Sequence, residues 1–289
     1  MSTWVWVDGN LAPAGEARVA ALDHGLTVGD GVFETCKVVD GTPFALTRHL
    51  ARLHRSAEII GLRLPWSDDA LRAACAETVG AAEIDAANAA TGVTRLRITV
   101  TGGPAPLGSE RGDTGPTVIV AMGALRAFPP TESVVVVPWT RNEHGATAGL
   151  KTISYAENVR ALAFAHAQGA SEAVFANTRG DLCEATGSNV FVVERGVVRT
   201  PPADAGCLLG VTRALVIEAC AAEGVPCEEV PVTMDAFRAA DEAFLTSSTR
   251  EVQAIRSVDG VDLPVAPGPV TARLRDAFRA LVASGTHLS

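Results

Sequence analysis

The chain reads Leu150-Lys151-Thr152-Ile153-Ser154-Tyr155 midway along its 289 residues, and this stretch decides how the rest is interpreted. No lysine other than Lys151 follows Lys37, so a chain that otherwise uses arginine keeps one lysine after a small and flexible segment. A lysine that forms a Schiff base needs burial or cationic neighbours, because its amine must be partly neutral near pH 7. On its own, Lys151 is most simply a solvated surface side chain, so its meaning depends on the motifs that follow.

Three later segments carry the polar groups that an aromatic phosphate cofactor needs. They are Glu184-Ala185-Thr186-Gly187-Ser188-Asn189, Leu209-Gly210-Val211-Thr212-Arg213 and Thr246-Ser247-Ser248-Thr249-Arg250. A carboxylate beside a strand keeps a pyridine nitrogen protonated, and a Gly-Val-Thr turn that opens a helix binds a phosphate dianion. Taken singly, the three segments are a solvated loop, an ordinary threonine N-cap and a polar turn. Together with Lys151 they indicate a cofactor site.

The order of these motifs resembles the pyridoxal-phosphate (PLP) enzymes of fold type IV, over about residues 4–258. This family includes branched-chain aminotransferase, D-amino-acid aminotransferase and aminodeoxychorismate lyase. The stretch from Asp23 to Glu34, Asp-His-Gly-Leu-Thr-Val-Gly-Asp-Gly-Val-Phe-Glu, is also similar to the family's N-terminal signature. The set of motifs is specific, although each of its parts is weak.

The resemblance implies a role for each residue of the expected site. Lys151 is the Schiff-base lysine, Glu184 pairs with the pyridine nitrogen, and Arg52 binds the phosphate from a helix. Tyr155, the single tyrosine of the chain, faces the cofactor's 3-hydroxyl. The remaining residues of the expected cofactor site are Ser188, Asn189, Leu208, Val211, Thr212, Ser248 and Thr249.

The element pattern is α+β. Alternating strand-like segments at 4–7 and 31–39, helices at 47–60 and 67–79 and strands at 95–101 and 117–122 make up the first half. Thr47 is expected to be the N-cap of the first long helix. The resemblance implies a small N-terminal α/β sandwich over 1–122, a linker over 123–130, and a larger C-terminal pseudo-barrel with surrounding helices over 131–289. The second domain is expected to carry the PLP lysine.

The expected activity is transamination between an amino donor and a 2-oxo acid by a ping-pong mechanism. The donor is a D-amino acid, a branched-chain L-amino acid or an (R)-primary amine. Glu34 favours an aminotransferase, since the lyase branch typically has threonine there. The Thr-Arg-Gly segment that binds the substrate carboxylate in D-amino-acid enzymes is here Thr101-Gly102-Gly103, without arginine. Candidate substrate residues are therefore Phe33, Lys37, Arg97, Arg141 and His144.

Several other readings stay open at this point. 4-Amino-4-deoxychorismate lyase, which releases pyruvate and 4-aminobenzoate, is the nearest alternative. A Schiff-base aldolase would not need Glu184, and a non-enzymatic binding protein would carry no coloured cofactor. No Gly-x-Ser-x-Gly segment supports a serine hydrolase.

The composition of the chain argues against several kinds of binding partner for the protein. The net charge of −9 and pI near 5.2 argue against nucleic acid. No apolar stretch reaches the roughly 20 residues that span a bilayer, and the N-terminus has no signal-peptide pattern. The six cysteines lack metal-binding spacing and are expected to be mostly small buried hydrophobes of a reducing cytoplasm. No metal site is expected; His49 and His54 are expected to be solvated, and the resemblance implies a homodimer.

Overall fold

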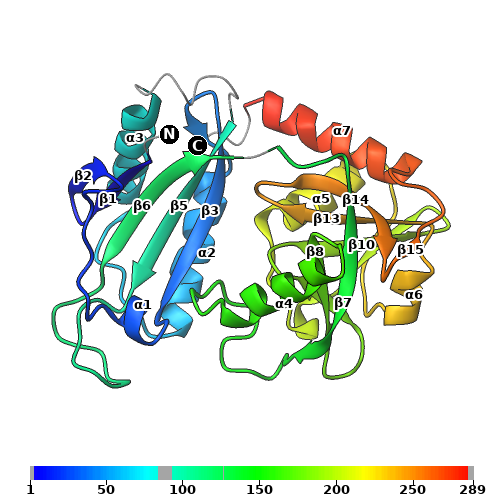
Figure 1. Cartoon of the computed structure of the whole chain (residues 1–289). Helices are drawn as coiled ribbons and strands as arrows, with labels where there is room; N and C mark the ends of the chain where they lie inside the picture. Colours follow the sequence, from blue (N-terminus) through cyan, green and yellow to red (C-terminus); the bar gives the residue numbers. More distant parts are fainter. Residues whose placement is uncertain (1–2, 84–92, 126, 286–289) are drawn as a thin grey trace. The chain divides into compact units, whose positions relative to one another are not determined.

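The computed structural model describes residues 3–83, 93–125 and 127–285. The chain divides into two compact units (Figure 1). The first comprises Met1–Arg126, Leu150–Ser154 and Thr286–Ser289, and the second comprises Ala127–Gly149 and Tyr155–Gly285. Lys151 therefore groups with the first unit, whereas the sequence analysis placed it in the second domain.

The first unit is built on a six-stranded antiparallel sheet in the order β2-β1-β6-β5-β3-β4. Its strands are β1 (Trp4–Val7), β2 (Asn10–Pro13), β3 (Gly31–Val39), β4 (Thr42–Pro43), β5 (Val93–Thr101) and β6 (Val118–Ala124). Its helices are α1 (His24–Thr27), α2 (Leu46–Ile59) and α3 (Asp68–Glu83). Leu50 and Leu53 of α2 and Leu71 of α3 join one buried cluster with Val32 and Leu96 of the sheet. One sheet face is thus apolar and covered by α2 and α3, and the other face carries the alternate residues.

Two expectations for α2 are wrong. The residue that caps its N-terminus is Ala45, in a left-handed conformation with φ 56°, and not Thr47. His49 is buried rather than solvated, with 1% of its surface exposed. The reason is tertiary, since Glu34 on the covered face of β3 supplies a partner for the ring. His54 does lie at the surface, where it contacts Asp68.

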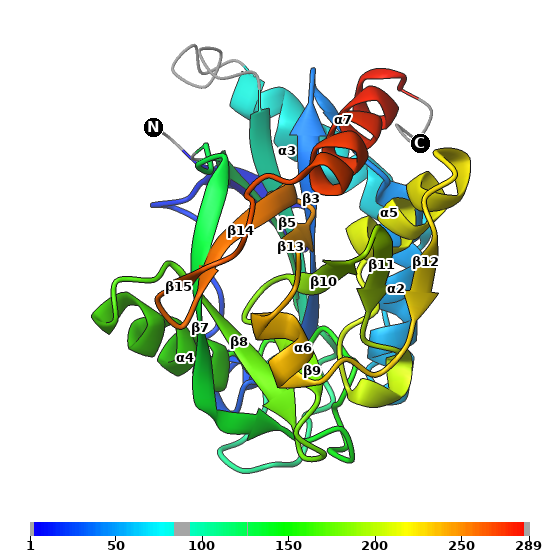
Figure 2. The same cartoon turned by 90° about the vertical axis from the view of Figure 1, so that its right-hand side faces the viewer.

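The second unit contains a nine-stranded mixed sheet along β12-β11-β10-β13-β14-β7-β8-β9, with β15 beside β14 (Figure 2). The strands are β7 (Thr131–Arg141), β8 (Glu172–Asn177), β9 (Leu182–Ala185), β10 (Asn189–Glu194), β11 (Val197–Thr200), β12 (Cys227–Glu229), β13 (Glu242–Ser247), β14 (Glu251–Val258) and β15 (Val261–Asp262). The last strand of the path, β9, turns directly into β10, and Ala185 N–H donates to Ser188 C=O across that turn. The sheet is therefore curled, as expected for a pseudo-barrel.

Helices cover this curled sheet on different sides. They are α4 (Ala156–Ala167), α5 (Val211–Ala222), α6 (Met234–Arg238) and α7 (Pro269–Ala283), with a short 3-10 turn at Ala203–Ala205. α4 packs on β7 and β8 through a cluster that contains Ala161, Ala165 and Phe175. α5 and α7 pack together against β13, and Phe237 of α6 is buried in a further cluster. No helix in the described ranges is both long and apolar enough to cross a membrane.

Candidate active site

The segment that carries Lys151 pairs with the edge of β3 through an isolated antiparallel bridge between Thr152 and Val32. Lys151 C=O accepts a hydrogen bond from Phe33 N–H at 3.0 Å, and Ile153 N–H donates to Gly31 C=O at 3.0 Å. The small strand β4 pairs only with Val38 and Val39, so it leaves the other half of this edge open to the segment. A Cβ on Gly31 would lie 2.9 Å from Ile153 and 2.5 Å from a backbone oxygen, so glycine permits this close approach.

The side chain of Lys151 lies against Phe33, on the face of the sheet opposite to the one that α2 and α3 cover. Its Nζ is 4.3 Å from the centroid of the Phe33 ring. The guanidinium carbon of Arg97 is 3.6 Å from the same centroid, and Arg97 Nε donates to Thr99 Oγ1. Arg97 and the amine of Lys151 therefore lie over the same aromatic ring.

Lys37 and Arg95 belong to the same face. In the β3–β5 pairing Lys37 lies opposite Arg95, and Thr35 lies opposite Arg97. Side chains at directly opposite positions of an antiparallel pair share a face. The face next to Lys151 is therefore positively charged, which suits an anionic substrate.

The covered face of the same strand holds a buried ionic cluster. Arg52 donates to Glu34 twice, from Nε to Oε1 and from Nη2 to Oε2, each at 2.7 Å. His49 Nδ1 lies 2.6 Å from Glu34 Oε2. Burial favours the neutral acid, but Arg52 and His49 outweigh it and lower the pKa of Glu34 to about 2. Burial also lowers the pKa of His49, with the charges of Arg52 and Lys151 acting in the same direction and Glu34 opposing them.

In the second unit, Glu184 lies on β9 next to Arg141 at the end of β7. Leu208 N–H donates to Glu184 Oε2 at 3.0 Å, and Arg141 Nε is 3.5 Å from Glu184 Oε1. Arg141 also contacts Glu157 and donates to Asn158 Oδ1. The carboxylate is 15% exposed and held on one side by a backbone donor and on the other by a cation.

The N-terminus of α5 is prepared for an anion. Gly210 is its N-cap and provides no side-chain cap, so the first N–H groups of the helix have no partner within it. Val211 and Thr212 are buried at this end. Asn189 Nδ2 donates to Leu208 C=O at 2.7 Å, and a Cβ on Gly210 would lie 2.1 Å from Asn189 Oδ1. Asn189 thus fixes the loop before the helix.

The hydroxyl cluster after β13 forms a tight turn. Ser247 Oγ accepts from Arg250 N–H and lies 3.5 Å from Thr249 Oγ1. Ser248 and Thr249 are half-buried. Arg250 bridges to Glu132 at 3.0 Å and Glu172 at 3.1 Å, which anchors the turn to the sheet.

The two remaining predicted residues lie at the start of α4 and in the loop after β7. Tyr155 is the N-cap residue of α4 and is half-buried. His144 is exposed, and its backbone N–H donates to Asn142 Oδ1.

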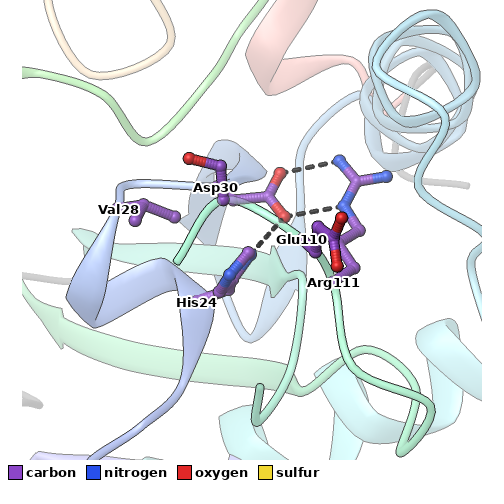
Figure 3. Close-up of a pocket in the computed structure, with 6 residues that line it drawn as sticks. His24, Val28, Asp30, Glu110 and Arg111 are labelled. Atoms are coloured by element: carbon purple, nitrogen blue, oxygen red, sulfur yellow. Dashed lines mark hydrogen bonds and ion pairs between the residues drawn. The ribbon is translucent and has the colours of Figure 1, made fainter. Parts of the chain in front are cut away.

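A pocket in the first unit lies away from these predicted residues (Figure 3). Its cavity is about 560 Å³ and is lined by His24, Val28, Asp30, Ser109, Glu110 and Arg111. Arg111 donates to both oxygens of Asp30 at 2.7 Å, and His24 Nδ1 is 3.2 Å from the same carboxylate. The Arg111 hydrogen bonds lower the pKa of Asp30, against the effect of burial. These contacts brace the turn that leads into β3.

The sequence and the fold of this chain are similar to those of known proteins. The family model described as Amino-transferase class IV matches residues 31–258. The chain belongs to this family.

Relatives of this class IV aminotransferase include enzymes of both expected branches. D-alanine aminotransferase of Listeria innocua is 32% identical, over 95% of this chain and 94% of that protein. The branched-chain aminotransferase of Thermoproteus uzoniensis, solved with norvaline, is 30% identical with a TM-score of 0.87, over 99% of this chain and 96% of that one. A branched-chain amino acid aminotransferase from T.th., solved with pyridoxamine 5'-phosphate, has a TM-score of 0.89 at 26% identity, over 98% of this chain and 95% of that one. These findings confirm a PLP-dependent transaminase of fold type IV.

The residues present fit PLP. Ser188 Oγ and Thr246 Oγ1 are buried, and neither has a hydrogen-bond partner in the part of the chain that the structure describes. Both belong to the segments expected to hold the cofactor, and buried hydroxyls normally find partners. Together with the uncapped start of α5, they leave polar groups that a phosphate and a substituted ring would satisfy.

Proposed function

We propose that this transaminase binds PLP through Lys151, Glu184, the start of α5 and the turn at 247–249. The observation that carries the proposal is the backbone pairing of residues 151–153 with β3, which fixes the lysine beside Phe33. Arg52 would bind the phosphate, with Glu34 and His49 holding its guanidinium. Val211, Thr212 and Thr249 would complete the phosphate site, Leu208 would pack on the ring, and Tyr155 would face the 3-hydroxyl.

The chain's own groups then have defined tasks. Lys151 would hold the cofactor through its aldehyde group, and its free amine Nζ would accept and return the proton of the substrate's α carbon. Glu184 keeps the ring nitrogen protonated. PLP, when bound, supplies the electron sink that this proton removal requires. Because the donor gives up its amino group in one half-reaction and the 2-oxo acid receives it in the next, the kinetics are expected to be ping-pong.

The cationic face of the first unit is the proposed carboxylate site. Arg97 lies on the same ring as Lys151, and Lys37 lies one pair further along that face of the strands. Among the candidate substrate residues, Arg97 and Lys37 are the proposed carboxylate ligands, because both lie on the sheet face that carries Phe33 and Lys151. The donor is proposed to be a D-amino acid or a branched-chain L-amino acid, with (R)-primary amines as the third class.

We also propose a cytoplasmic homodimer. Leu22, Leu26, Val28 and Leu107 expose between 49% and 80% of their surface, and Leu22 C=O accepts a hydrogen bond from Ala105 N–H, which brings two of these segments together. Exposed apolar patches of this kind mark association surfaces. The six cysteines are free thiols, as in a reducing compartment. Sedimentation of the protein and of Leu26→Asp tests the dimer; a monomeric parent protein would exclude it.

One experiment tests the proposed chemistry. Borohydride treatment followed by peptide mapping should find a pyridoxyl group on Lys151, and its absence there would refute the proposal. The protein is then mixed separately with D-alanine, L-leucine, (R)-1-phenylethylamine and aminodeoxychorismate, and loss of the visible absorption band is followed. Loss of the band with D-alanine, L-leucine or (R)-1-phenylethylamine identifies the class of amino donor. Loss of the band with aminodeoxychorismate alone, together with release of pyruvate, would identify a lyase.

A further inference from the structure

Two turns of the second unit carry residues of the proposed cofactor site. Residues 186–188 connect β9 to β10 and follow Glu184, and we call them the ring-side turn. Residues 248–250 connect β13 to β14 and contain Thr249, and we call them the phosphate-side turn. The names follow the ends of PLP that Glu184 and Thr249 are proposed to bind. The position of one turn relative to the other therefore sets how the site matches its cofactor.

Sheet pairing brings the two turns to the same end of neighbouring strands. β10 and β13 are antiparallel with Asn189 opposite Thr246, so the start of β10 lies beside the end of β13. Ser188 Oγ and Thr246 Oγ1 are buried at this place, and neither has a hydrogen-bond partner among the described residues. Because buried hydroxyls normally have partners, this end of the strand pair suits a polar ligand.

One buried carboxylate reaches both turns, with one oxygen for each. Glu172, at the start of β8, exposes 2% of its surface. Its Oε1 accepts from Thr186 N–H at 3.2 Å, contacts the Thr186 hydroxyl and accepts from Ala173 N–H at 3.0 Å. Its Oε2 accepts from Arg250 Nη2 at 3.1 Å. Thr186 belongs to the ring-side turn and Arg250 to the phosphate-side turn, so Glu172 links the two turns directly.

Arg250 spreads its guanidinium over two carboxylates. Nη1 donates to Glu132 Oε2 at 3.0 Å and to Gln253 Oε1 at 2.6 Å, and Nη2 donates to Glu172. The backbone N–H of Arg250 donates to Ser247 Oγ at 3.1 Å, so the same residue closes the hydroxyl cluster. A planar guanidinium holds two acceptors at fixed angles, whereas a lysine ammonium acts as a point charge. Arg250 therefore transmits the position of Glu172 to the phosphate-side turn.

Glu132 provides a matched carboxylate in the same network. It is buried and pairs with the same guanidinium through Oε2. Its Oε1 contacts Ser171 Oγ and accepts from Ser133 N–H at 3.3 Å, at the junctions of β7 and β8. Glu132 thus supports Arg250 as Glu172 does, but its other oxygen is committed to these two serines instead of Thr186.

We propose that Glu172 and Arg250 are positioning residues that fix the ring-side and phosphate-side turns relative to each other, and so match the site to a phosphorylated pyridine. Both act through the turns and not on the reacting atoms. This inference rests on the proposed function, since the two turns hold the ends of PLP only if PLP is bound to Lys151.

The test compares Glu172→Gln with Glu132→Gln in the full-length enzyme. Dissociation constants for PLP and for pyridoxal, which lacks the phosphate, are measured by equilibrium dialysis. An amide has one acceptor oxygen and cannot serve both turns, so Glu172→Gln should weaken both ligands by roughly three- to tenfold, the range of one hydrogen bond. Glu132→Gln should weaken PLP by a similar factor but pyridoxal by less than about twofold, because the ring-side turn keeps its contacts with Glu172.

A third variant isolates the ring-side link. Thr186→Val removes the hydroxyl that contacts Glu172 but keeps the backbone bonds of the turn to Ala173 C=O and from Asn158 Nδ2. It should weaken PLP and pyridoxal by the same factor, and it should add little when combined with Glu172→Gln, since the two changes break one link.

Urea midpoints separate positioning from a loss of stability. Both carboxylate variants should lose similar stability, because each leaves Arg250 with one carboxylate, so only positioning explains a difference in pyridoxal binding. Equal pyridoxal binding in the two variants would overturn the inference, as would a Glu172→Gln effect confined to PLP. If borohydride labels Lys151 in the wild type, such a failure concerns this inference alone; without the label, the proposed function fails as well.

Discussion

Glu34 accepts two hydrogen bonds of 2.7 Å from Arg52, and both side chains are almost fully buried between β3 and α2. Breaking such a pair leaves a buried cation without its carboxylate, at a cost of about 3–5 kcal/mol. Glu34→Gln is therefore expected to lower the free energy of unfolding by about that amount, measured by urea denaturation. His54→Gln is the matched control, because it breaks the exposed His54–Asp68 contact, for which exposed pairs give about 1 kcal/mol or less. Equal losses in the two variants would contradict the importance of the buried pair.

The same cluster makes the protein sensitive to acid. The pKa of Glu34 is lowered to about 2 in the folded protein, so its stabilisation is present above the unfolded value near 4.5 and is lost as pH falls from there toward 2. The pKa of His49 is also lowered, so stability declines as pH falls below the unfolded value near 6.5. Urea midpoints measured from pH 8 to pH 3 should fall on the acid side. His49→Gln should flatten the part of this fall that begins near pH 6.5; an unchanged profile would show that His49 does not contribute.

Removal of the amine of Lys151 is expected to abolish turnover while the fold is retained. The segment is held by backbone hydrogen bonds to Phe33 and Gly31, which Lys151→Ala leaves in place. The measurements are the rate of amino transfer with each donor and the far-ultraviolet circular dichroism spectrum. Retained turnover in Lys151→Ala would refute the catalytic role.

Arg97 and Arg95 provide a matched pair for the carboxylate site. They are two residues apart on β5 and share a sheet face, but Arg97 lies on Phe33 and Arg95 is exposed and opposite Lys37. Arg97→Gln should raise the KM for the 2-oxo acid roughly 10- to 100-fold, since a hydrogen bond to a charged group contributes about 1.5–3 kcal/mol. Arg95→Gln should change it less than about threefold. Steady-state kinetics decide, and equal effects would exclude a specific role for Arg97.

Gly210 tests the anion site at the start of α5. A methyl group there would meet Asn189 Oδ1 at 2.1 Å, so Gly210→Ala must displace the loop that precedes the helix. We expect cofactor affinity to fall at least about tenfold, from the loss of a charge-assisted contact to phosphate, measured by equilibrium dialysis. In Gly80→Ala on α3, no neighbouring atom lies within 4 Å of the new methyl group, and stability should rise by about 0.5–1 kcal/mol without an effect on cofactor. Full retention of PLP by Gly210→Ala would argue against this site.

The local pattern predicts elements well where burial is one-sided or complete. Gly31–Val39 alternates along its whole length and is β3 to the residue, and the strand expected at 95–101 begins two residues earlier as β5. β14, at Glu251–Val258, does not follow from the pattern, because Gln253 interrupts it with a polar side chain. That side chain is buried in the structure, where Arg250 and the backbone oxygen of Pro129 satisfy its amide. Partners that are distant in the sequence cannot be predicted from the local pattern of residues.

The candidate site, too, has features that the local sequence predicts and features that depend on residues distant in the sequence. The motifs single out Lys151, Glu184 and the start of α5 because each chemistry needs a particular residue type at a particular element end. The partners of Arg52 and Arg141 were not predicted, since they depend on which sheet face and which helix turn meet. One signal was present for the first: Glu34 falls on the apolar side of β3 with Val32 and Cys36, and a carboxylate at such a place requires a cation.

The backbone bonds that hold Lys151 to β3 also decide the direction in which its amine points. Successive residues of a strand face opposite ways, so a shift of this pairing by one residue would turn the lysine to the other face of the sheet. The amine would then be aimed away from Phe33 and toward the face that carries Val32 and Glu34. The register of this pairing is therefore under as strict a constraint as the identity of the lysine itself.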